Sequence, residues 1–175
     1  MPTFRYALEM RAEPMALFQL SQDYARRLAW DPFLREARLL DGARAPGVGV
    51  RVWCVARGGL GMETEYVTYD PPRVVAVRMT RGPRILRRFA GTWRFAAVAP
   101  GVTRVSFQYA LAARPAWLRF ALDPLLAAVL GREMRRRLVA LRRAVETTDI
   151  LRADGAARVV EGDALDTQPT RPHTP

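Results

Sequence analysis

Between residues 34 and 111 the chain alternates short apolar segments with turn-forming residues, and this pattern limits the possible folds more than any other feature. Glycine, proline or aspartate stands in each link between consecutive segments. Such short links connect antiparallel neighbours, because parallel strands need long crossovers. The sequence therefore predicts an antiparallel meander with strands over Leu34–Leu40, Val48–Arg57, Met62–Tyr69, Arg73–Thr80, Leu86–Val98 and Thr103–Leu111.

The residues before this meander predict one more strand and two short helices. Apolar side chains alternate with mostly polar ones from Phe4 to Met10, which is the period of a half-buried strand. Pro14 fits the first turn of a helix, and Asp23 is a suitable N-cap for a second helix over Asp23–Ala29. Asp31, which precedes Pro32, should end that helix because a residue before proline disfavours helical geometry.

A long amphipathic helix is predicted after the meander. Asp123-Pro124 is typical of a helix start, and a shorter helix over Trp117–Leu122 is expected before a kink at Pro124.

An antiparallel sheet with one apolar face must be covered, and the long helix is large enough to cover it. We therefore predict an α+β fold in which a curved sheet of about seven strands wraps around a long C-terminal helix. The wedge between them is either filled by side chains or left as a cavity. The apolar face of the helix contains Leu126, Val129 or Leu130, Met134, Leu138, Leu141 and Val145.

Several local motifs occur in the order found in a known superfamily. They are Trp30-Asp31-Pro32, Gly47–Arg51, Tyr69–Arg73, Gly91–Phe95 and Gly101–Val105. With the arginine-rich final helix, they make residues 3 to 147 resemble the START-like (SRPBCC) superfamily, and in particular its polyketide cyclase/dehydrase and lipid transport branch. The resemblance implies a helix-grip fold with a central apolar cavity. It implies no particular reaction, because a fold does not determine a function.

Composition removes several kinds of chemistry and suggests a division of the chain. All 28 basic residues are arginine, and the single histidine, His173, lies near the end. A zinc centre, a histidine-dependent triad and lysine chemistry are therefore not expected, and we expect no metal and no cofactor. One cysteine and no signal peptide favour a cytoplasmic protein. We expect one START-like domain over residues 1–148 and a disordered tail over residues 149–175.

The predicted strand faces give candidate residues for the cavity. Aromatic and apolar side chains could bind a flat or chain-like hydrophobic ligand, although ordinary core packing is the alternative for each of them. The side of the sheet that Trp53 faces is ambiguous. The apolar candidates are Tyr6, Leu8, Trp53, Tyr66, Met79, Trp93, Phe95, Phe107, Tyr109, Leu122 and Met134. The polar candidates are Arg51, Glu63, Arg78 and Arg94, for which pairing across strands on the solvent face is the alternative.

Positive charge is unevenly distributed along the sequence. Residues 71 to 122 contain ten arginines and no acidic residue. The chain as a whole uses arginine in place of lysine, so a compositional bias is one explanation, and attraction to an anionic membrane or to RNA is the other. The candidates for an anionic-surface contact are Arg84, Arg87, Arg88, Arg132, Arg136 and Arg143.

Three functions are therefore open. The leading hypothesis is binding, transport or sensing of a hydrophobic small molecule or lipid in the cavity. The second is a cofactor-independent cyclase or dehydrase, for which no catalytic residue is identified. The third is association with an anionic membrane or RNA through the arginine-rich face, with RNA the less expected partner, since no aromatic residues interleave the basic ones as in RNA-binding motifs. The apolar segment 115–122 either packs on the edge of the sheet or forms a lid or interfacial anchor beside the cavity mouth. The sequence sets no oligomeric state.

Overall fold

The alternating segments form one antiparallel sheet in the computed structural model, which describes residues 3–114, 117 and 119–151 without the side chains of residues 119–123 and 127. The strand order is β1-β7-β6-β5-β4-β3-β2, so the first strand closes the meander by pairing with the last. The strands are β1 (Thr3–Met10), β2 (Leu34–Leu39), β3 (Arg51–Ala56), β4 (Gly61–Asp70), β5 (Val74–Arg81), β6 (Leu86–Ala99) and β7 (Val102–Ala113).

Within the described residues three helices complete the fold, and two of them differ from the prediction. They are α1 (Pro14–Gln22), α2 (Arg27–Trp30) and α3 (Arg119–Thr147). Asp23 Oδ1 accepts hydrogen bonds from the N–H groups of Ala25 (3.0 Å) and Arg26 (3.2 Å), so this side chain stabilises the turn before α2 rather than capping a helix at residue 23.

The predicted helix start at Asp123 is wrong. Helix α3 begins at Arg119 and contains Pro124 as its sixth residue. Pro124 lies just beyond the first four residues, whose N–H groups have no partner within the helix, so the helix lacks one further backbone hydrogen bond at this position. The predicted short helix over Trp117–Leu122 lies partly outside the described residues.

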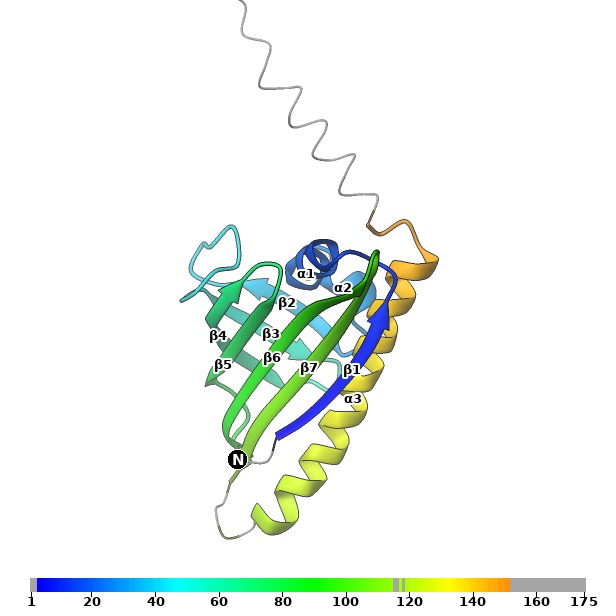
Figure 1. Ribbon diagram of the computed structural model, residues 1–175. Helices are drawn as coiled ribbons and strands as arrows, with labels where there is room; N and C mark the ends of the chain where they lie inside the picture. Colours follow the sequence, from blue (N-terminus) through cyan, green and yellow to red (C-terminus); the bar gives the residue numbers. More distant parts are fainter. Residues whose placement is uncertain (1–2, 115–116, 118, 152–175) are drawn as a thin grey trace, which may run out of the picture.

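Helix α3 lies along one side of the curved sheet (Figure 1). Its buried stripe, formed by Met134, Leu138, Leu141 and Val145, packs into the core, and the helix contacts β1 and β7. Each such side chain stabilises the fold by about 1.5–3 kcal/mol when fully buried. Strands β2 to β5 curve away from the helix (Figure 1), and the sheet therefore encloses a wedge on that side. This is the helix-grip fold that the sequence predicts.

The outer face of β3 and β4 is defined by Trp53. Its indole ring lies against Gly61, where a Cβ atom would be only 2.5 Å from the ring. Trp53 pairs with Glu63 across the two strands, so these residues share the outer face. Val52 and Thr64, the next pair in the register, are buried on the inner face.

The packed chain extends a little beyond the predicted domain boundary at residue 148. Ile150 and Leu151 are partly buried against the core. Arg26 Nη1 donates a hydrogen bond of 3.0 Å to the carbonyl oxygen of Ile150. The rest of the predicted tail, residues 152–175, lies outside the described residues.

Candidate functional site

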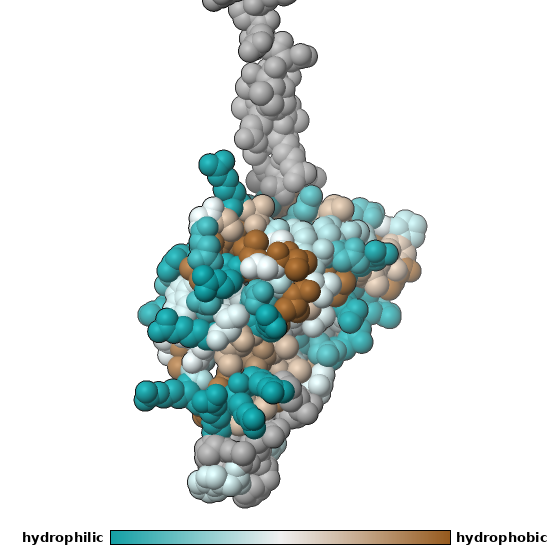
Figure 2. Space-filling model, turned by 90° about the vertical axis from the view of Figure 1, so that its left-hand side faces the viewer, coloured by the Kyte–Doolittle hydropathy of each residue, from teal (hydrophilic) through white to brown (hydrophobic). Residues whose placement is uncertain are grey.

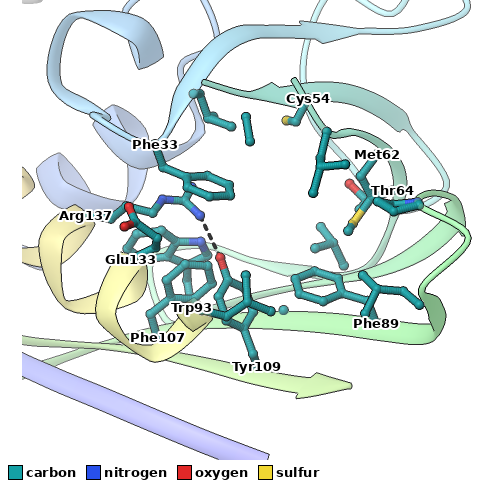
Figure 3. A pocket seen from close by; sticks show the side chains of 18 of the residues that line it. Phe33, Cys54, Met62, Thr64, Phe89, Trp93, Phe107, Tyr109, Glu133 and Arg137 are labelled. Atoms are coloured by element: carbon teal, nitrogen blue, oxygen red, sulfur yellow. Dashed lines mark hydrogen bonds between the residues drawn. The ribbon is translucent and has the colours of Figure 1, made fainter. Parts of the chain in front are cut away.

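A cavity of about 320 Å³ occupies the wedge between the curved sheet and α3 (Figure 3). Its volume lies at the lower end of the range for small-molecule sites. Side chains from β3 to β7, from α3 and from the segment around α2 form its walls. Most of the lining is apolar, as at Met62, Val77, Phe89 and Leu130. The cavity therefore offers a ligand a mostly apolar surface with a few polar groups within reach.

Four of the aromatic residues predicted for the cavity lie in its lining. Tyr66 comes from β4, Trp93 from β6, and Phe107 and Tyr109 from β7. Trp93 and Phe107 stack with ring centroids 4.0 Å apart and an angle of 17° between the ring planes. The register pairs them directly across β6 and β7, which brings the two rings together on the inner face.

The other apolar candidates lie outside the lining. Phe95 and Met134 are buried in the core, whereas Tyr6 and Leu8 pack against its β1 side, next to α3. Met79 packs against Gly82, and Trp53 covers the outer face of the sheet. The side chain of Leu122 lies outside the described residues.

The four polar candidates are also placed outside the cavity. Arg51 donates hydrogen bonds to Asp41 (2.8 and 2.9 Å) and to Glu63 (3.2 Å). Arg78 pairs with Glu65 at 2.9 Å, and Arg94 is exposed. The physical reason is the strand alternation: residues 51, 63, 65, 78 and 94 face away from the neighbours that line the cavity. Ion pairs or contact with water satisfy their charges there.

The polar end of the site is built around Asp31 instead. Helix α2 ends at this residue because Pro32 follows it, and Asp31 adopts extended backbone geometry. Its buried Oδ2 atom accepts hydrogen bonds from Arg27 Nε (3.0 Å) and from Arg137 Nη2 (2.7 Å) and Nε (3.1 Å). Oδ1 accepts from the N–H group of Phe33 at 3.1 Å. One carboxylate thus holds two guanidinium groups from distant parts of the chain.

Arg137 connects this carboxylate to the cavity wall. Its Nη1 atom donates a hydrogen bond of 2.7 Å to the hydroxyl of Tyr109 (Figure 3). The guanidinium carbon lies 5.1 Å from the ring centroid of Phe107 and 5.2 Å from that of Phe33. Aromatic faces attract cations at such distances, so the rings help to hold a charged group that is almost fully buried. In the same way, the guanidinium carbon of Arg27 lies 5.0 Å from the ring centroid of Trp30.

A second polar chain lies along the cavity wall formed by β4. Tyr24 and Tyr66 share a hydrogen bond of 2.8 Å between their hydroxyls, and Tyr66 donates to Gln22 Oε1 at 2.8 Å. Since Tyr66 has one proton to donate, Tyr24 must be the donor in the first bond. Gln22 Nε2 then donates to Ser21 Oγ, which donates to the carbonyl oxygen of Phe18, each at 2.8 Å. The chain has one direction and leaves no buried member unsatisfied.

Burial keeps the phenols and the thiol of the site in their neutral forms. It raises the pKa of Tyr24 to about 12 and also raises the pKa values of Tyr66 and Tyr109. It likewise raises the pKa of Cys54, which lines the cavity. Near neutral pH these groups therefore serve as hydrogen-bonding groups rather than as bases or nucleophiles.

In the ionic cluster of Asp31, Arg27 and Arg137, by contrast, neighbouring charges outweigh the effect of burial on the pKa values of Asp31 and Arg137. Burial alone would raise the pKa of Asp31, but Arg137 and Arg27 outweigh it and hold the pKa below its usual value. Burial alone would lower the pKa of Arg137, but the Asp31 carboxylate outweighs it and raises the pKa. Asp31 and Arg137 are therefore both charged near neutral pH.

The sequence contained signals for the two arginines that were missed. Arg137 lies three residues after Met134 and one before Leu138, so it belongs to the apolar stripe of α3. Arg27 stands four residues before Asp31, a spacing that brings side chains together on a helix. Asp31 was interpreted as a helix-ending residue, and its buried carboxylate shows that it also organises the site.

The candidates for an anionic-surface contact are all exposed. Three of them lie in the β5–β6 turn or at the beginning of β6, and three lie on α3, where Arg136 pairs with Glu133 at 2.8 Å. The β5–β6 turn and the beginning of α3 lie at the same end of the molecule (Figure 1). On the side shown in Figure 2, long hydrophilic side chains project at this end, and a small hydrophobic patch lies further up.

The fold and the sequence have recognisable relatives. A protein of known structure from Thermus thermophilus is 20% identical, with a TM-score of 0.69 over 82% of this chain and 97% of that one. A START superfamily protein from Mycobacterium smegmatis is 12% identical, with a TM-score of 0.70 over 82% and 97%. An aromatase/cyclase from Streptomyces sp. R1128 is 16% identical, with a TM-score of 0.64 over 82% and 95%. Identities this low establish the fold alone.

No curated protein matches the sequence. A family match nevertheless covers most of the chain, from residue 1 to residue 146. It agrees with the motifs that led to the START-like resemblance and with the helix-grip fold. The chain belongs to the family described as polyketide cyclase/dehydrase and lipid transport.

Proposed function

We propose that this protein binds a hydrophobic small molecule or lipid in the cavity between the sheet and α3. The observation that carries the proposal is a largely apolar cavity of about 320 Å³ that borders the packed core. An unfilled apolar cavity costs stability in proportion to its volume, and a bound apolar ligand removes that cost. The family description, which names both cyclases and lipid transport, supports a ligand of this kind.

A neutral fluorescent probe tests the proposal without involving charge. N-Phenyl-1-naphthylamine should bind the purified protein with an increase in fluorescence. Val77 lines the cavity, so Val77→Trp should fill part of it and weaken binding at least tenfold. Val67 is 42% exposed and absent from the lining, so Val67→Trp is the matched control and should leave binding unchanged. Equal affinities for the two variants would contradict binding in this cavity.

We propose no reaction for this cavity. Asp31 is committed to two arginines, and Glu133, a carboxylate in the described lining, accepts a hydrogen bond of 2.8 Å from Arg136. Glu133 is thus the one carboxylate in the described lining, and it is ion-paired with Arg136, which supports binding better than acid–base catalysis.

A second proposed function is contact between the cavity mouth and an anionic membrane. Leu60, Ile85 and Val129 belong to the lining and are 62%, 40% and 54% exposed. Arg84 and Arg88 are exposed close to Ile85 in sequence. Exposed apolar side chains beside arginines suit insertion between anionic head groups, and a lipid ligand would enter the cavity from that surface.

Vesicle sedimentation tests this contact. The protein should sediment with vesicles that contain phosphatidylglycerol more than with pure phosphatidylcholine vesicles, and added salt should weaken the binding. The double variant Arg84→Gln/Arg88→Gln should lose most of the binding. The matched control Arg44→Gln/Arg94→Gln removes the same charge elsewhere and should retain it. Equal losses in the two variants would show that net charge, rather than this surface, is responsible.

A further inference from the structure

The buried ionic cluster at one end of the cavity does not balance its own charge. Arg27 and Arg137 are each positive, and Asp31 is negative, so the three side chains together carry one net positive charge. Their side chains are only 7%, 6% and 0% exposed. Glu133 also lines the cavity and lies near Arg137 (Figure 3), but its ion pair is with Arg136. An uncompensated charge with so little access to water is costly unless another group pairs with it.

The cluster also has more hydrogen-bond donors than acceptors. Arg27 donates through Nε to Asp31 and through Nη1 to the carbonyl oxygen of Ser21, and its Nη2 group has no partner among the described residues. Arg137 uses one hydrogen from each of its three nitrogens. The Tyr109 hydroxyl accepts from Arg137, and its own proton has no acceptor within the described part of the chain. A guanidinium group has five donors, so several remain available at this end.

The residues that carry these donors line the cavity. Arg27, Arg137 and Tyr109 all belong to its lining. Figure 3 shows Arg137 and Tyr109 at one end, together with Trp93 and Phe107, whereas Met62 and Phe89 lie at the other. A ligand that fills the cavity would therefore present one end to guanidinium and hydroxyl donors and the rest to apolar side chains.

Given the ligand binding proposed above, we infer that the ligand is an apolar carboxylate whose oxyanion binds between Arg27, Arg137 and Tyr109. One carboxylate supplies the missing negative charge and the missing acceptors together. Guanidinium groups bind carboxylates with good geometry, and such charge-assisted hydrogen bonds are roughly twice as strong as neutral ones. The apolar body of the ligand occupies the part of the cavity lined by β3 to β6 and by Leu126 and Leu130.

Isothermal titration calorimetry with matched ligands tests this inference on the full-length protein. One series is decanoate, 1-decanol and decylamine, and the other is 2-naphthoate, 2-naphthalenemethanol and 2-naphthylmethylamine. Within each series the apolar body is constant and only the charge of the head group changes. In the series whose body fits better, the acid should bind at least tenfold more tightly than the alcohol, and the amine should bind most weakly.

The three possible outcomes separate this inference from the proposed function. A tenfold preference for the acid supports the inference. Equal binding of acid and alcohol overturns it and leaves hydrophobic ligand binding intact. Binding of none of the six compounds, including the neutral alcohols, counts against the proposed function itself and so against the inference as well.

Variants locate the carboxylate. Arg27→Gln removes the excess charge and leaves Asp31 paired with Arg137, so affinity for the acid should fall at least tenfold while affinity for the alcohol changes less than twofold. Arg78→Gln, which removes an exposed arginine outside the cavity, should change neither affinity. Tyr109→Phe is a second variant, which keeps both arginines and should lower the affinity for the acid severalfold. An acid preference that survives in both Arg27→Gln and Tyr109→Phe would contradict the assignment.

Discussion

Arg137 and Arg78 each pair with one carboxylate at nearly the same distance, 2.7 Å to Asp31 and 2.9 Å to Glu65. The exposed fractions of the side chains differ greatly, at 6% and 0% in the first pair against 63% and 25% in the second. Water screens the pair on the outer face of the sheet and can hydrate either partner alone. The buried pair has no such alternative, so each of its members depends on the others.

This difference explains why the number of arginines in the chain does not indicate a function, whereas the buried positions of Arg27 and Arg137 do. Most arginines of the chain lie in water, where removing a single charge has a small effect. Arg27 and Arg137 bring positive charge into an apolar cavity, where charge selects the partner. The comparison predicts effects that decrease in order from the shared carboxylate to the exposed pair.

Loss of the shared carboxylate should have the largest effect. Asp31→Asn would leave two buried guanidinium groups without an anion, and the free energy of unfolding should fall by about 3–5 kcal/mol. Urea unfolding followed by tryptophan fluorescence measures this change. Glu65→Gln is the matched control at the exposed pair and should cost less than about 1 kcal/mol. Similar losses for the two variants would remove the distinction between the pairs.

The two buried arginines should differ from each other. Arg137→Gln removes two hydrogen bonds to Asp31 and one to Tyr109, and the unfolding free energy should fall by about 2–4 kcal/mol. Arg27→Gln leaves a neutral Asp31–Arg137 pair and should cost about 1–2 kcal/mol. The same urea experiment compares them. A larger loss for Arg27→Gln would mean that Arg27, and not Arg137, is the main partner of Asp31.

The sequence predicted the architecture well because the architecture depends on repeated patterns. Turn residues between apolar segments specify an antiparallel meander, and a stripe of apolar residues specifies the covering helix, so small boundary errors at single residues do not change the result. The alternation of Phe4 to Met10 predicted a first strand, and the structure pairs this strand, β1, with β7. The start of α3 was misplaced because a proline is compatible with both a helix start and the first turns of a helix.

The cavity was harder to predict, since it depends on how far the sheet curves away from the helix. Aromatic residues on the inner face, such as Trp93 and Tyr109, could be identified from strand alternation. Alternation alone could not tell which face of β3 is the inner one, and the polar candidates were chosen on the wrong side of the sheet. The charged groups at the polar end of the cavity, Arg27, Asp31 and Arg137, come from α2, from the residue after it and from α3, and they meet only in three dimensions.

Stability should also depend on pH through Asp31. The pKa of Asp31 is lowered in the folded state, so the carboxylate contributes stability above its unfolded pKa of about 3.9 and loses that contribution as the pH falls through the folded value. The difference in unfolding free energy between the wild type and Asp31→Asn should therefore be constant above about pH 5 and shrink below about pH 4. Urea unfolding at a series of pH values measures it. If the difference in unfolding free energy instead grew as the pH fell, this prediction would be contradicted.

Removal of the exposed arginine should have the smallest effect. Arg78→Gln should change the free energy of unfolding by less than about 1 kcal/mol, and added salt should reduce even that change. The measurement is urea unfolding of the wild type and the variant at low and high salt. A loss comparable to that of Arg137→Gln would mean that exposure does not determine the energetic role of these pairs.

The most direct measurement of the cavity's charge is the pKa of a carboxylate bound inside it. Decanoate labelled with ¹³C at the carboxyl carbon can be followed by NMR in complex with the protein as the pH is lowered. A positive cluster of Arg27, Arg137 and Asp31 predicts that the bound carboxyl stays ionised at pH values where free decanoate is already protonated. Protonation of the bound carboxyl at a higher pH than the free acid, as burial in a purely apolar cavity would cause, would contradict this account.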